Sequence, residues 1–550
     1  MSLTACSRAL QIPEIVHMIC LEADAKLAYL RQHTLPSLAR TSRIFSGSAL
    51  DLIWRELESL VPLIKCMPET LWEERTEGSG PRTAKCIHLR HPIMSTDIPR
   101  LLFYSVRVKS LYIHSDIRYG SVHLEVLQAL DLCLANQVLM PALSDLVWAP
   151  AKKELQTFGH HFLGPSSRQI DIRLDNSRPS LSLLPYLKTS CPLLYDVRLS
   201  LTATPLTVRL VSDAVCGWQH LKELAIPALD QPGFIHVSRL PSLTKLSLYC
   251  VNGPGLYLPG FLSGPTFPAL EDLSMNCETA RFCTGLIQVV SSRQLGSLSI
   301  DPLANWTTSA WKELLTTLRD YLDHTALETL EVQQEASQHS RPADPASYIL
   351  SADTLRPLLA FKKLSSLTFQ IYPGVDVDDD FLAEMAVAWR RISSLEFGSE
   401  VLMSERPKPT LKCLVTFARH CPRLNGLGIR VDGSTIPPFS QVPGKRICHS
   451  LNSLNVGTSP MNSLRVAEMA AFLSNLFPDL EYLFTHDSNT PLTEPLASYA
   501  KSWSAVSDLL PVFCSVRAQE EEFWTQEFAS EESDEESDED EEMDGESRSS

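Results

Sequence analysis

The chain has few basic residues for its length, and this deficit limits the partners it can bind. Its 550 residues include 48 Lys and Arg against 65 Asp and Glu, a formal net charge of -17. Residues 518–550 alone hold sixteen acidic residues and one arginine, so the other 517 residues carry only -2. Nucleic acids are bound through clustered Lys and Arg that neutralise phosphates. The composition therefore argues against nucleic acid as a partner.

The chain also lacks a long apolar run and closely spaced cysteine pairs. No stretch of eighteen apolar residues occurs, so we expect no membrane span and no membrane partner. None of the fourteen cysteines forms a C-x-x-C pair or has the spacing of a zinc site. Scattered thiols are typical of a reducing compartment. Glu14 and Asp24 interrupt the first apolar stretch, which argues against a signal peptide. We expect a cytoplasmic or nuclear protein.

Known catalytic motifs are absent as well. The sequence contains no G-x-S-x-G, no H-E-x-x-H and no phosphate-binding loop. The acidic run 378–380 lacks the glycine and terminal glutamate of a calcium loop and favours the start of a helix. We interpret the pair His88 and His91, and the pair His160 and His161, as surface or strand residues. The prediction is a protein that is not an enzyme, with no cofactor and no metal.

What the sequence does contain is a repeated apolar triplet, L-x-x-L-x-L, in which other apolar residues or Thr replace some leucines. Its first positions are Leu143, Leu194, Leu221, Leu243, Leu270, Leu295, Leu327, Leu364, Ile392, Leu424, Leu451 and Leu480. From Leu194 on, these positions are 22 to 37 residues apart. A repeat of this length indicates stacked units that bury an apolar edge against one another. Weaker patterns at Ile87, Leu111 and Ile170 indicate further strands.

The repeats predict an α/β fold in which residues 83–490 form a curved leucine-rich-repeat solenoid, with parallel strands on the concave side and helices on the convex side. Triplet side chains point inward, and the intervening and following residues face the open concave side. The candidate target-binding residues on that side are Arg198, Tyr249, Asn276, Asp301, Glu331, Gln370 and Arg430. Their mixed charge favours a protein or a modified peptide as the target. Only Tyr249 and Arg430 are of types common at binding hot spots.

The first 58 residues show helical rather than strand spacing. Three apolar stripes predict three short helices within residues 11–58: Ile12 to Ile19, a second beginning at Leu35 after a possible N-cap at Thr34, and Leu50 to Leu57 after the breaker Ser46-Gly47-Ser48. Residues 59–82 are predicted to be a joint. So small a helical unit buries little apolar surface, so it needs a neighbouring domain or a partner.

The amino-acid composition changes at residue 491 and again at residue 518. Residues 491–517 are amphipathic and are predicted to cap the last repeat. Residues 518–550 are acidic and rich in serine, and we predict a disordered tail. Ser530, Ser533 and Ser537 precede acidic residues and are candidates for phosphorylation, which adds roughly -1.5 to -2 charges each.

The N-terminal segment resembles an F-box. The resemblance rests on Ile12-Pro13-Glu14-Ile15 with Ile19, on the run 35–45, and on the stretch 49–57 with Trp54. The stretch 54–68 is also similar to fungal F-box proteins that carry C-terminal leucine-rich repeats. Together with the repeats, this architecture covers nearly the whole chain.

The resemblance implies a substrate-recognition subunit of an SCF-type E3 ubiquitin ligase. The F-box would bind a Skp-type adaptor, which links to a cullin scaffold, and the repeats would bind the protein to be ubiquitinated. Carried over to this sequence, the adaptor-binding residues are Ile12, Pro13, Ile15, Ile19, Leu35, Leu38 and Trp54. Of these, Pro13 and Leu35 lie at the predicted helix starts, and we expect them to contact the partner.

A second interpretation stays open at this point. Leucine-rich repeats followed by an acidic tail also resemble acidic leucine-rich nuclear phosphoproteins and the GTPase-activating proteins of Ran. The chain would then be a leucine-rich-repeat binder of basic proteins that uses the acidic tail and has no link to ubiquitination. The N-terminal helices, which those families lack, favour the ligase subunit.

Overall fold

The structure is a computed structural model. It describes residues 10, 12–24, 28–77, 83–114, 120–134, 137–251, 266–334, 347–372, 374–398, 406–438, 450–485, 492 and 494–545. The chain divides into two compact units. The first comprises Met1–Val251 with Ser263–Leu270, and the second comprises Asn252–Leu262 with Glu271–Ser550.

The N-terminal segment consists of helices α2 (Pro13–Asp24), α3 (Ala28–Thr41) and α4 (Arg43–Ile53). Two predicted boundaries differ from the structure. Helix α3 begins before Thr34 and holds Pro36 inside it, where the Ser37 hydroxyl donates to the His33 carbonyl at 2.7 Å. Helix α4 runs through the predicted breaker, because its N-cap Ser42 accepts a hydrogen bond from the Ile44 amide and the helix tolerates an exposed Gly47.

The predicted joint is a folded part of the first unit. Strand β1 (Glu56–Leu57), which the helical prediction had included, pairs in parallel with β4 (Ser110–Ile113). Helix α5 (Val61–Ile64) follows, and then β2 (Trp72–Glu77) pairs antiparallel with β3 (Ala84–Leu89). Strand β3 also pairs in parallel with β5 (Ser121–Val122). The weak pattern at Ile87 therefore belongs to this small three-stranded sheet and not to the main parallel one.

The main sheet of the first unit is parallel, with strand order β1-β4-β6-β7-β8-β9-β10. The further strands are β6 (Asp145–Trp148), β7 (Gln169–Arg173), β8 (Asp196–Ser200), β9 (Glu223–Ile226) and β10 (Lys245–Val251). The register aligns one buried apolar residue from each strand in a single row: Leu57, Leu111, Leu146, Ile170, Val197, Leu224 and Leu246. Each strand thus contributes one apolar side chain to a continuous core.

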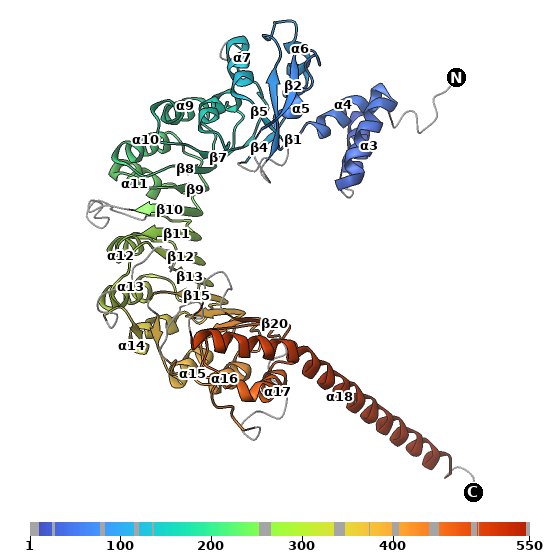
Figure 1. Ribbon diagram of the computed structural model, residues 1–550, viewed down its shortest axis with the longest axis vertical. Coiled ribbons are helices and arrows are strands. Elements are labelled where there is room, and N and C mark those ends of the chain that lie inside the picture. The colour runs from blue at the N-terminus through green and yellow to red at the C-terminus, as the bar shows by residue number, and fades with distance from the viewer. Residues whose placement is uncertain are drawn as a thin grey trace. The chain divides into compact units, whose positions relative to one another are not determined.

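Helices connect the strands of this unit and lie on one side of the sheet from β7 to β9, as Figure 1 shows for α9, α10 and α11. They are α6 (Ile98–Ser105), α7 (Leu124–Leu134), the 3-10 helix η2 (Lys153–Phe162), α8 (Arg178–Leu181), α9 (Leu183–Ser190), α10 (Pro205–Val215) and α11 (Gln231–Ser238). Parallel strands need such crossover connections.

The second unit repeats the arrangement in eight parallel strands. They are β11 (Asp272–Cys277), β12 (Ser297–Pro302), β13 (Thr329–Gln333), β15 (Ser366–Gln370), β17 (Ser394–Phe397), β18 (Gly426–Ile429), β19 (Ser453–Gly457) and β20 (Tyr482–Thr485). Their leucines align in one row: Leu273, Leu298, Leu330, Leu367, Leu395, Leu427, Leu454 and Leu483. A strand coincides with each of the twelve predicted triplets in the chain.

Helices also connect the strands of the second unit (Figure 1). They are α12 (Ala280–Val289), α13 (Thr308–Tyr321), α14 (Ala352–Leu355), η6 (Arg356–Ala360), α15 (Asp379–Ala388), α16 (Lys412–His420), η8 (Ser463–Arg465) and α17 (Val466–Leu476). The acidic run 378–380 starts α15 as predicted, because the Asp378 side chain accepts from the Phe381 amide at 3.0 Å. Two short strands, β14 (Leu350–Ser351) and β16 (Val375–Asp376), pair beside the main sheet.

The chain ends in one long helix, α18 (Leu496–Gly545), which packs against α17 and β20. Trp503 is buried and donates to the Ser459 carbonyl at 2.9 Å, and Arg517 donates to the Ser474 hydroxyl at 3.0 Å. The prediction of a disordered tail from 518 differs from the structure, where the helix continues to Gly545. Glutamate has a high helix propensity, and residues 512–544 contain no glycine or proline that would end a helix.

Candidate functional site

The helical segment holds a small core and leaves apolar side chains exposed around it. Cys20, Leu35, Ala49 and Leu52 form that core, with one or two residues from each helix. On the outer side of α2 and just before it, Ile12 is 45 % exposed, Met18 67 % and Ile19 39 %. Ile44 of α4 and Leu21 of α2 are exposed as well. The described part of the first unit thus keeps an apolar surface on these helices.

The structure separates the predicted adaptor-binding residues into two groups. Ile12, Pro13 and Ile19 are exposed, and Ile15 is half-buried beside them. Leu35 is only 1 % exposed, and Leu38 packs against the same core. The expectation that Leu35 contacts a partner is therefore wrong for this conformation. Because α3 begins upstream of Thr34, Leu35 lies within the helix and turns toward α4 instead of projecting from a helix end.

Trp54 is half-buried at the end of α4. Its ring stacks on that of Tyr104 in α6, with 4.7 Å between the ring centroids. The side chain therefore joins the helical segment to the rest of the first unit. Only part of it is accessible to another protein.

On the strand face of the first unit, Arg198 and Tyr249 are exposed as predicted. The Arg198 guanidinium lies 3.3 Å from Glu223 Oε2 and 3.6 Å from Asp196 Oδ1, so the two carboxylates hold it in place. Partial burial, together with the carboxylates of Asp171 and Asp196, raises the pKa of Tyr249. This face thus presents one charged and one aromatic side chain, which are of types common at binding hot spots.

The strand face of the second unit is accessible at some predicted positions and covered at others. Asn276, Asp301 and Glu331 are half-buried and lie on adjacent strands. Gln370 and Arg430 are only 5 % and 9 % exposed, so the expectation that they stand on an open wall is wrong.

Turns that follow neighbouring strands lie beside both residues. Beyond β15, the Gln334 amide donates to the Gln370 carbonyl at 2.8 Å, and the Tyr372 amide donates to Gln334 Oε1 at 2.9 Å. The segment 406–409, which follows β17, lies beside Arg430 at the end of β18. Strand alternation places both side chains on the strand face, but it does not predict that the loops after neighbouring strands lie beside them.

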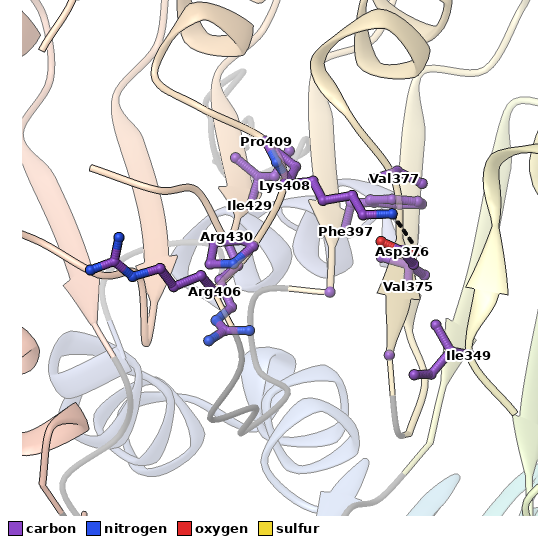
Figure 2. Close-up of a pocket in the computed structure, with 13 residues that line it drawn as sticks. Ile349, Val375, Asp376, Val377, Phe397, Arg406, Lys408, Pro409, Ile429 and Arg430 are labelled. Atoms are coloured by element: carbon purple, nitrogen blue, oxygen red, sulfur yellow. Dashed lines mark hydrogen bonds and ion pairs between the residues drawn. The ribbon is translucent and has the colours of Figure 1, made fainter. Parts of the chain in front are cut away.

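One of these turns forms a pocket at the carboxyl ends of β17 and β18. Its volume is about 240 Å³. Figure 2 shows the labelled residues that line it: Ile349, Val375, Asp376, Val377, Phe397, Arg406, Lys408, Pro409, Ile429 and Arg430. In open parallel sheets, ligands bind outside the carboxyl ends of the strands.

The pocket combines apolar side chains with three basic residues. Lys408 Nζ lies 2.7 Å from Asp376 Oδ2, and this hydrogen bond and charge raise the pKa of the lysine (Figure 2). Arg406 and Arg430 also line the pocket, and the Arg406 guanidinium lies 4.0 Å from Asp432 Oδ2 just outside it. An anionic group on an apolar stem matches this lining.

Two glycines shape the wall of the pocket. Gly374 has φ 127° and Gly398 has φ 66°, which are left-handed values that favour glycine. A Cβ at Gly398 would lie 3.2 Å from Val375 Cγ2. The wall therefore depends on glycine at the end of β17.

The interpretation of the histidines as surface or strand residues holds for His88, which lies on β3, and for the exposed His91, but not for the buried His161 in η2. His88 and His161 are buried and have carboxylate partners. Lys152 and, more weakly, His88 hydrogen-bond to Glu77 and lower the pKa of that carboxyl to about 2. His161 Nε2 lies 3.0 Å from Asp131 Oδ1. The partners lie far away in the sequence, so the spacing of the histidines alone gave no signal for them.

The phosphorylation candidates Ser530, Ser533 and Ser537 lie along α18, where only the backbone is described. In the described part of the chain, no helix has both the length and the apolar character needed to cross a membrane. A scan against models of known protein families found no match, and a search of curated proteins found none either.

Proposed function

We propose that this chain is the substrate-recognition subunit of an SCF-type E3 ubiquitin ligase. In this proposal α2, α3 and α4 form an F-box that binds a Skp-type adaptor carried by a cullin scaffold. The parallel strands and their connecting helices form a leucine-rich-repeat solenoid that binds the target protein. The chain itself contributes binding and no catalysis.

The apolar surface on the helical segment is the observation that carries the proposal. Ile12, Met18 and Ile19 remain exposed although Val16 and Cys20 of the same helix are buried. Exposed apolar side chains that gather on one element mark protein interfaces, and stable interfaces are built around such anchors. The adaptor is the partner that the resemblance implies for these helices.

The register of the strands supports the second half of the proposal. In the second unit one leucine per strand lies in a continuous row, in which Leu330, Leu367 and Leu395 are fully buried. Each repeat therefore buries its apolar edge against the next repeat, which is the packing expected of a repeat protein. Repeat proteins of this kind bind other proteins over extended surfaces.

The pocket of the second unit suggests what part of the target is bound. Arg406 and Lys408 are exposed where they line it, and the buried Arg430 lines it as well. Arginine and lysine side chains favour carboxylate and phosphate groups. An acidic or phosphorylated side chain of the target suits this position.

Capture of a Skp-type adaptor by the full-length chain tests the proposal. The double change Ile12→Asp with Ile19→Asp places two charges on the exposed apolar surface without removing a core residue, and we expect affinity to fall at least tenfold, about 1.4 kcal/mol or more. Leu132→Asp is the matched control, because Leu132 is 84 % exposed on α7, outside the helical segment.

Failure of the wild-type chain to bind the adaptor would reject the proposal. Equal binding by the wild type and the double variant would place the interface elsewhere. Salt-sensitive capture of basic proteins without the adaptor would favour the alternative, a leucine-rich-repeat protein that acts through its acidic C-terminal helix.

A further inference from the structure

A cluster of polar side chains lies in the first unit, where β3 meets the start of α7. His88 on β3, His123 just before α7 and Glu125 in the first turn of α7 bring three potential metal ligands together. Their nitrogen and oxygen atoms all lie within 4.8 Å of one another. The proposed ligase function makes no use of this cluster.

The distances within the cluster match those between ligands of one zinc ion. Glu125 Oε1 lies 3.2 Å from His88 Nδ1 and 3.6 Å from His123 Nδ1. Zinc binds histidine nitrogen and carboxylate oxygen at about 2.0–2.2 Å in a tetrahedral arrangement, which places neighbouring ligand atoms about 3.3–3.5 Å apart. The stacked rings of His88 and His123, with 4.2 Å between centroids, bring both Nδ1 atoms to the same carboxylate oxygen.

An unsatisfied nitrogen points to a missing ligand at this position. His123 Nδ1 is buried and has no hydrogen-bond partner among the residues that the structure describes. Buried polar atoms in folded proteins are nearly always paired with protein, water or an ion. A bound cation would satisfy this nitrogen and would take the place of the 3.2 Å hydrogen bond between His88 Nδ1 and Glu125 Oε1.

The surroundings of His88 favour a cation at Nδ1 and not at Nε2. Nε2 lies 2.8 Å from Glu77 Oε1, which is the carboxylate-to-histidine contact that orients metal-binding imidazoles and fixes their tautomer. The Lys152 ammonium lies 2.7 Å from the other oxygen of Glu77 and would repel a metal ion on that side. Cys86, which lies close to Glu77 and His88, falls on this disfavoured side.

We infer that His88, His123 and Glu125 form a zinc site, with Glu77 as the positioning residue for His88. The set of two histidines and one glutamate leaves a fourth position for water or another ligand. The ion would join β3 to the start of α7, two elements that sequence order separates by more than thirty residues.

Zinc titration of the chelator-treated full-length protein tests the site. We expect one equivalent to bind at about micromolar free zinc and to raise the melting temperature. The variants are Glu125→Gln, which keeps an acceptor for the Leu89 amide, and His123→Ala, whose side chain is partly exposed. Both should lose the bound equivalent while their metal-free forms melt like the metal-free wild type.

Two further variants sharpen the result. His91→Ala is the matched control, because His91 is exposed and follows the same strand, and it should bind zinc as the wild type does. Glu77→Gln should weaken binding about 10- to 100-fold without abolishing it, as expected for a residue that acts through a ligand. Cobalt in place of zinc gives a second readout through the visible absorption bands of tetrahedral Co²⁺.

Three outcomes would overturn the inference. The wild type could fail to bind zinc, or Glu125→Gln and His123→Ala could bind it unchanged. Binding could also vanish with His160→Ala alone, which would assign the ion to the neighbouring group of Asp131, His160 and His161. None of these results depends on whether the chain binds an adaptor.

Discussion

The helical segment (α2, α3 and α4) and the aligned leucine rows of the parallel strands bury their apolar side chains to different extents. In the leucine rows, residues such as Leu330 and Leu367 are fully buried, because the next repeat covers each apolar edge. In the helical segment, Ile12 and Met18 stay exposed, because three short helices offer too little surface to cover them. The apolar side chains that the sequence pattern singles out are thus covered within the chain in one region and left exposed in the other.

The largest expected effect is in the strand row of the second unit. Leu395→Ala removes a fully buried side chain between Leu367 and Leu427, and we expect a loss of about 2–5 kcal/mol in the free energy of unfolding. Urea unfolding followed by circular dichroism measures it. Leu464→Ala is the control, since Leu464 is 90 % exposed and should cost less than about 0.5 kcal/mol. Equal shifts for both variants would contradict the burial contrast.

A cavity in the helical segment should destabilise only the three helices of that segment. Leu52→Ala removes a core side chain of α4 and is expected to destabilise the segment by about 2–4 kcal/mol. Hydrogen exchange should show lost protection in α2, α3 and α4, with unchanged protection in the parallel strands. Should the strands lose protection equally, the two regions would unfold as one, and the comparison would fail.

Period and spacing predicted the strand rows because every triplet has the same environment. The triplet at Leu364 or at Leu424 needs only its neighbours in the repeat to be buried, and both are. Helical spacing at Leu35 showed which residues share a face but not which face the other helices cover. The buried Leu35 and the exposed Ile12 follow from the packing of three helices, which no local pattern specifies.

The pocket and the histidine cluster lay beyond prediction for a related reason. Lys408 and Asp376 are 32 residues apart, and His88 and Glu125 are 37 apart, in segments without repeat character. Their contacts depend on the paths of loops between repeats, where lengths vary from unit to unit. A repeated sequence pattern predicts the structure that all repeats share. These two sites lie in loops that differ from one repeat to the next.

Helix caps allow the two regions to be compared with one chemical change. Thr204 caps α10 in a capping box with Thr207, and Ser42 caps α4 by accepting from the Ile44 amide. Thr204→Ala and Ser42→Ala should each cost about 1 kcal/mol of stability. Hydrogen exchange should assign the first loss to α10 and its neighbours and the second to the helical segment alone. Loss of protection outside these elements would show that the caps are coupled to distant structure.

The smallest expected effect is a pH dependence confined to the strand-containing part of the first unit. Burial, aided by the charge of His160, lowers the pKa of His161 below 6.5. A histidine of lowered pKa stays neutral in the folded state while the unfolded state takes up a proton. Stability is therefore complete above about pH 6.5 and falls as the pH drops below that value.

His161→Asn removes the titrating group, so its unfolding midpoint between pH 7 and pH 6 should fall less than that of the wild type. Denaturant unfolding at several pH values in that window measures the difference. The helical segment provides the internal reference, because its described histidines, His17 and His33, are exposed. Mild acid should therefore lower hydrogen-exchange protection around η2 and leave that of α2 to α4 unchanged. An identical slope in the wild type and in His161→Asn would instead assign the acid sensitivity to the carboxylates of the ion pairs.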